Sequence, residues 1–374
     1  MNFSLIDTQI RKYRSERLDL IRGIACLYII AGHVAGWTGS AGWFSEFVRI
    51  CTSFTQPGGE TNAGVILFIV LSGYCIHRNR LECLTNKSVI DFYRKRIVRI
   101  MPLFLFGTII GVLFWMLSFN ADITSRCTAT YAISLRAILL KITGINVIIP
   151  FAYSDTYLGN APLVTVEVLL YLYAAYPLIL LLEENFRRIW KVLFGLLWAL
   201  VFLLSFKNGY YNWWNNACVI SFLPFWYMGG VSNNHKNKGN LCAKLTISVL
   251  LYIVLYILLI SVDGGNFDIT ILYLIAESRK LILGFVFANI IEFFDVEKQV
   301  KIMTFGLKDI GSISFSLYAV HAPVAIFFIA AGADVMTVLI GIFLSGTVCY
   351  ILVEKKLSDN LCHLDIRNMA ERFK

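Results

Sequence analysis

Hydrophobic residues along the chain occur in long blocks separated by short polar stretches. Most blocks are long enough to cross a hydrocarbon layer of about 30 Å at about 1.5 Å of helix per residue. We mark ten such spans, near residues 18–38, 63–79, 98–119, 161–182, 189–206, 217–231, 244–262, 269–291, 311–331 and 334–353. The pattern therefore predicts an all-α integral membrane protein.

The positions of Lys and Arg predict the orientation of these spans. The loops 80–97, 183–188, 232–243 and 292–310 hold most of the basic residues, and such loops usually face the cytoplasm. We therefore expect both termini to be cytoplasmic. A single ten-helix domain, 18–353, then lies between a basic tail, 1–17, and a second tail, 354–374.

Residues 131–149 are nearly apolar enough to form a further span, but they include Arg136, Lys141 and Gly144. A span here would move every later basic loop to the outside. We therefore interpret this segment as an interfacial or re-entrant part of a long outer loop.

Composition agrees with a membrane domain, since 58% of the 374 residues are hydrophobic and 15% are charged. The formal charge of +9 does not indicate a nucleic-acid partner, because the basic residues form short runs beside apolar blocks. The nine cysteines are scattered and form no C-x-x-C pair. Neither a metal site nor a disulfide framework is expected.

Ionisable residues inside spans are costly, so each is a candidate for function. The first span contains Arg22 and His33, which lie on nearly the same helix face about 16 Å apart along the axis. Glu167 in the fourth span falls at about the same depth as His33, near the outer boundary. A carboxylate beside an imidazole would orient it as a base, so we expect these two side chains to meet.

A second cluster is expected at the cytoplasmic side, where Arg96 and Arg99 share one face at the start of the third span. With Arg22 they could bind the phosphates of a coenzyme A thioester. Each signal has a simpler alternative, because basic clusters often only orient a helix, and an intramembrane histidine can serve packing alone. His321 has a claim similar to that of His33 but no evident charged partner.

Five segments in order resemble the acyltransferase-3 family of membrane O-acyltransferases. They are RLDLIRGIACLYIIAGHV, FIVLSGYCIHR, FYRKRIVRIMPLF, VEVLLYLYAAYP and SISFSLYAVHAPV. The chain departs from the family pattern at Val164 and Thr165, where Trp-Ser is usual. Some members carry a C-terminal soluble hydrolase-like domain, which we do not expect here.

The resemblance implies O-acetylation of a surface polysaccharide such as lipopolysaccharide O-antigen or exopolysaccharide. It makes His33 and Glu167 the catalytic residues, and it assigns Arg22, Arg96, Arg99 and Ser72 to binding of the donor, acetyl-CoA, without a metal. The partners would be the acyl-CoA, a surface or lipid-linked glycan and membrane lipids. His33 could act as a general base or accept the acyl group itself. A transporter or flippase, or a glycan polymerase, remains an alternative.

Overall fold

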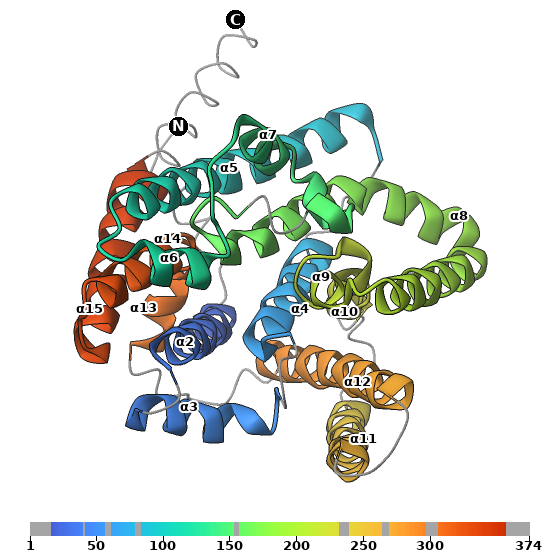
Figure 1. Ribbon diagram of the computed structural model, residues 1–374. Coiled ribbons are helices and arrows are strands. Elements are labelled where there is room, and N and C mark those ends of the chain that lie inside the picture. The colour runs from blue at the N-terminus through green and yellow to red at the C-terminus, as the bar shows by residue number, and fades with distance from the viewer. Residues whose placement is uncertain are drawn as a thin grey trace, which may run out of the picture. The chain divides into compact units, whose positions relative to one another are not determined.

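The computed structural model describes residues 16–39, 42–56, 61–78, 84–152, 157–231, 239–263, 269–296 and 306–356. Within these ranges the chain forms helices and no strand, which confirms the all-α prediction (Figure 1). Residues 1–15 and 357–374, which make up most of the two predicted tails, lie outside the described residues.

The chain divides into two compact units, which we call unit 1 and unit 2. Unit 1 draws on the ranges 1–29, 50–80 and 222–312, and unit 2 on the ranges 30–49, 81–221 and 313–374. Each unit is thus assembled from segments that are far apart in the sequence.

Most helices of unit 1 come from three separate parts of the chain. They are the first part of α2 (Glu16–Thr38), α4 (Ala63–Arg78), most of α10 (Val219–Val231), α11 (Gly239–Asp263), α12 (Ile269–Val296) and α13 (Leu307–Ser312). In this unit α12 packs against both α11 and α4. Gly73 of α4 lies so close to α10 that a Cβ there would overlap the backbone of Trp226. Small residues at a helix crossing permit this close approach.

Unit 2 holds the rest of α2 and most of α3 (Trp43–Ser53), together with the remaining helices. These are α5 (Asn86–Met116), α6 (Ala121–Thr128), α7 (Leu135–Thr143), α8 (Val164–Lys207), α9 (Tyr211–Asn216), α14 (Ser314–Ala330), α15 (Val335–Cys349) and a π-helix, Tyr350–Lys355. Helix α14 packs against α15, α5 and α6 (Figure 1). A Cβ at Gly107 of α5 would lie 2.6 Å from the carbonyl oxygen of Ala319, so α5 and α14 are in close contact.

Among the described residues, six helices are long and apolar enough to cross a membrane, so the predicted count of ten spans is not confirmed. They are Glu16–Thr38, Asn86–Met116, Ala161–Phe186, Arg188–Lys207, Leu241–Val262 and Val335–Lys355. Two further apolar helices, Ala63–Arg78 and Ser314–Ala330, are shorter than a typical span. Of the two other predicted spans, α10 has only 13 residues and α12 carries several charged side chains. The protein is a multi-pass membrane protein, while the orientation of its termini stays a prediction.

The predicted boundary between the fourth and fifth spans corresponds to a sharp bend in α8. At Phe186 the backbone leaves helical geometry, with φ −136° and ψ 33°. Two span-length segments therefore adjoin at the predicted loop 183–188 (Figure 1).

The segment 131–149 does not form a span-length helix. Ser134 caps the start of α7, and Gly144, with a φ of 64°, ends it after nine residues. Nine residues cover only about 14 Å. This agrees with leaving the segment out of the predicted spans.

Candidate active site

Two histidines from distant parts of the sequence meet in unit 2. His33 lies in the last part of α2 and His321 in α14, and His33 Nδ1 is 2.9 Å from His321 Nε2. The two rings are nearly parallel, with centroids 5.2 Å apart. His321 is fully buried, whereas His33 is half-buried. Only one histidine of the pair is therefore accessible to a substrate.

A hydrogen-bond chain fixes the tautomers of both rings. His321 Nδ1 lies 2.8 Å from the carbonyl oxygen of Tyr318, which can only accept, so this nitrogen carries the proton. In a neutral ring Nε2 of His321 is then an acceptor, and Nδ1 of His33 must donate to it. Nε2 of His33 consequently keeps its lone pair, as a general base requires.

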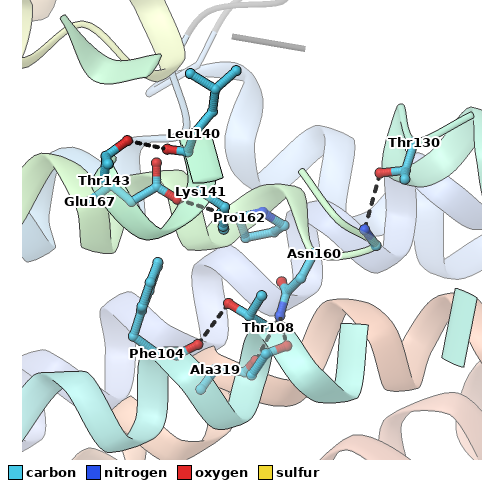
Figure 2. A network of polar contacts seen from close by, with 12 residues as sticks. Phe104, Thr108, Thr130, Leu140, Lys141, Thr143, Asn160, Pro162, Glu167 and Ala319 are labelled. Carbon is cyan, nitrogen blue, oxygen red and sulfur yellow. Dashed lines mark hydrogen bonds and ion pairs between the residues drawn. The ribbon is translucent and has the colours of Figure 1, made fainter. Parts of the chain in front are cut away.

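Glu167 does not meet His33, so the expected pairing of these two residues is wrong. Oε1 of Glu167 is 2.5 Å from Nζ of Lys141, and both side chains are 1% exposed (Figure 2). The buried side chain of Asn146 also lies against this carboxylate. A buried carboxylate requires a charged or hydrogen-bonding partner, and α7 supplies it from the segment that we treated as a loop.

Asn160 joins three elements around α14. Its Nδ2 donates to the carbonyl oxygens of Gly107, 3.0 Å away, and of Ala319, 2.9 Å away (Figure 2). Nearby, the hydroxyl of Tyr318 donates to the carbonyl oxygen of Pro162 at 2.6 Å. These buried bonds hold the helix that carries His321 against α5 and against the segment that leads into α8.

Two of the residues predicted to bind the donor lie in unit 1. Arg22 donates to Oδ1 of Asp19 at 2.5 Å and contacts Sγ of Cys75 at 3.2 Å. Asp19 is buried, so Arg22 is half of an ion pair and not an isolated cation. Ser72 lies three residues before Cys75, one turn earlier in α4, and is half-buried.

The other two predicted cations lie in α5 of unit 2. The Arg96 guanidinium lies 5.7 Å from the ring centroids of both Phe92 and Tyr173, a cation–π arrangement. Arg99, one turn later, is exposed. Because Arg22 belongs to unit 1, the shared cationic cluster stays a prediction.

The sequence reasoning overlooked a group of buried charges in α12. Glu277, Arg279 and Lys280 are each no more than 3% exposed. Lys280 pairs with Glu277 at 2.7 Å, and Arg279 donates to the hydroxyl of Tyr252 at 2.5 Å. The sequence did carry a signal for this group, because three charged residues fall within four positions of a predicted span.

The fold and the paired histidines define a multi-pass helical membrane protein with a candidate base near one end of α2. The chain belongs to the acyltransferase 3 family, because the family model of this acyltransferase domain matches residues 15–354. This match confirms the resemblance carried by the five segments. No curated protein and no solved structure matches the chain.

Proposed function

We propose that this protein transfers an acetyl group from acetyl-CoA to a hydroxyl of a surface polysaccharide, such as lipopolysaccharide O-antigen or exopolysaccharide. The family supports acyl transfer. The observation that carries the catalytic role is the chain from the Tyr318 carbonyl through His321 to His33, which leaves Nε2 of His33 as the base.

In the proposed reaction, the hydroxyl oxygen of the sugar attacks the thioester carbonyl carbon of the donor while Nε2 of His33 takes the hydroxyl proton. The C–S bond then breaks, and the coenzyme A sulfur leaves with the proton from His33. His321 accepts a hydrogen bond from Nδ1 of His33 throughout, which holds the ring and stabilises its positive charge. His321 is thus a positioning residue and His33 the catalytic one.

In the proposed arrangement the donor enters from the cytoplasm of a bacterial cell and the acceptor from the outer face of the inner membrane. Arg22, Arg96 and Arg99 would contact the phosphates of the donor, and Ser72 its thioester. Glu167 supports the site indirectly, because its ion pair with Lys141 fixes α7 against α8.

The test is NMR of the surface glycan from cells that lack the gene and carry either the wild-type protein or His33→Ala. We expect O-acetyl signals with the wild type and none with the variant, at equal amounts of protein in the membrane. Normal O-acetylation by the variant would overturn the role of His33. A change of glycan length without O-acetyl signals would instead favour a polymerase.

A further inference from the structure

A cavity of about 480 Å³ lies within unit 2, next to the histidine pair. The end of α2, helix α6 and the turn between α14 and α15 form it. Its lining includes Trp37, Arg126, Cys127, Ala333 and Asp334. The volume falls in the range of about 300–1,000 Å³ that is usual for small-molecule sites.

Trp37 connects this cavity to the proposed base. Its indole centroid is 5.1 Å from the ring of His33 and 6.3 Å from the ring of His321. The same side chain lines the cavity. A molecule in the cavity would therefore contact a ring that packs against both histidines.

The charged side chains of the lining keep hydrogen-bonding capacity. Asp334 caps α15 by accepting from the backbone of Met336 and Thr337 and from the Thr337 hydroxyl, which leaves about one of the four lone-pair sites of its carboxylate. Arg126 pairs with Asp122 at 2.7 Å and is 65% exposed. A guanidinium has five N–H donors, so several remain available.

These features suit a ring with an apolar face and several hydroxyls. We propose that this cavity binds the acceptor sugar, with its C–H face on Trp37 and its hydroxyls on Arg126 and Asp334. One hydroxyl then points past Trp37 toward Nε2 of His33. The inference rests on the proposed function and names the acceptor subsite of the same reaction.

Cys127 provides a direct measure of occupancy, since it lines the cavity and is a free, half-buried thiol. Burial raises the pKa of this thiol, so labelling is run at mildly alkaline pH. The purified protein is treated with N-ethylmaleimide, and modification of each cysteine peptide is followed by mass spectrometry. The probe is polysaccharide from cells that lack the gene.

We expect the polysaccharide to slow labelling of Cys127 and to leave labelling of the exposed thiol of Cys51 unchanged. Cys51 is the matched control because it does not line the cavity. Equal rates at Cys127 with and without saturating polysaccharide would overturn the proposal. Equal slowing at both cysteines would also overturn it, because it would show coating of the protein surface.

Substitutions at two alanines test the cavity through the KM values of the transfer reaction. Ala333 lines it, whereas Ala331, two residues earlier, is exposed and does not. Ala333→Trp should raise KM for the polysaccharide by about tenfold or more, with KM for acetyl-CoA unchanged, and Ala331→Trp should change neither. An unchanged KM in Ala333→Trp would contradict the assignment.

The two assays separate this inference from the proposed function. If the wild-type protein transfers no acetyl group to the polysaccharide, the proposed function fails, while protection of Cys127 still decides whether the cavity binds the glycan. If transfer proceeds without protection of Cys127, the proposed function stands and the acceptor subsite lies elsewhere.

Discussion

His33 Nδ1 donates to His321 Nε2 across 2.9 Å, so the two rings form one hydrogen-bonded chain, and in the proposed reaction only His33 is the base. The first is accessible and the second fully buried. A neutral imidazole therefore holds the position that a carboxylate occupies in the Ser-His-Asp arrangement.

Replacement of His321 by alanine should lower kcat by about 10²-fold, since the tautomer of His33 is then no longer fixed. His321→Gln should recover part of this loss, because its side-chain oxygen can accept from Nδ1 of His33. The measurement is acetyl transfer at saturating acetyl-CoA and polysaccharide. Near-normal kcat in His321→Ala would remove the positioning role.

The ion pair of Lys141 and Glu167 should be tested by charge exchange. Either Glu167→Gln or Lys141→Met leaves one buried charge without its partner and should destabilise the protein by about 3–5 kcal/mol. The double variant Lys141→Glu, Glu167→Lys restores opposite charges and should be more stable than the less stable charge-removal variant. Thermal unfolding in detergent gives the comparison, and equal stability of all variants would contradict a structural pair.

Asn160→Ala should lower the free energy of unfolding by about 1–3 kcal/mol, because the carbonyls of Gly107 and Ala319 lose a buried donor. Asn160→Asp should not restore stability, since a carboxylate cannot donate. Asn208→Ala is the control, as Asn208 bonds only one carbonyl at an exposed helix end. A similar loss in both alanine variants would argue against a special role for Asn160.

Gly73→Ala should be strongly destabilising, because the added methyl group overlaps the Trp226 backbone across the α4–α10 crossing. Gly195 of α8 has no atom within 4 Å of an added Cβ. Gly195→Ala should therefore stabilise its helix by up to about 1 kcal/mol. Unfolding of both variants in detergent tests whether the two substitutions change stability in opposite directions.

The hydropathy pattern predicted most helix positions, since length and apolar content determine which segments can enter a membrane. It could not predict that α10 is short, or that α12 buries Glu277, Arg279 and Lys280 as a cluster. Such charges are tolerated only with partners, which here come from the same helix, as Glu277 does for Lys280, and from other helices, as Tyr252 does for Arg279. Those partners are properties of the packed protein.

The sequence makes His33 a candidate because an ionisable residue inside an apolar block is conspicuous. The sequence did not reveal the partner of His33, because depth in the membrane fixes only one of the three coordinates that place a side chain. Glu167 and His33 share a predicted depth, yet the rotation of α8 places Glu167 beside Lys141. His321 was visible in the sequence, but its neighbour could be identified only once α14 was placed against the end of α2.

The burial of α14 has a consequence for how the bilayer affects this enzyme. Twelve of its 17 residues are buried, including His321, whereas α15 exposes an apolar stripe at Met336, Ile340, Leu344 and Val348. Lipid chains therefore meet α15, and a change in bilayer thickness strains that outer helix first. The burial of α14 shields His321 from such strain, so the position of its ring should vary little between lipids of different chain length.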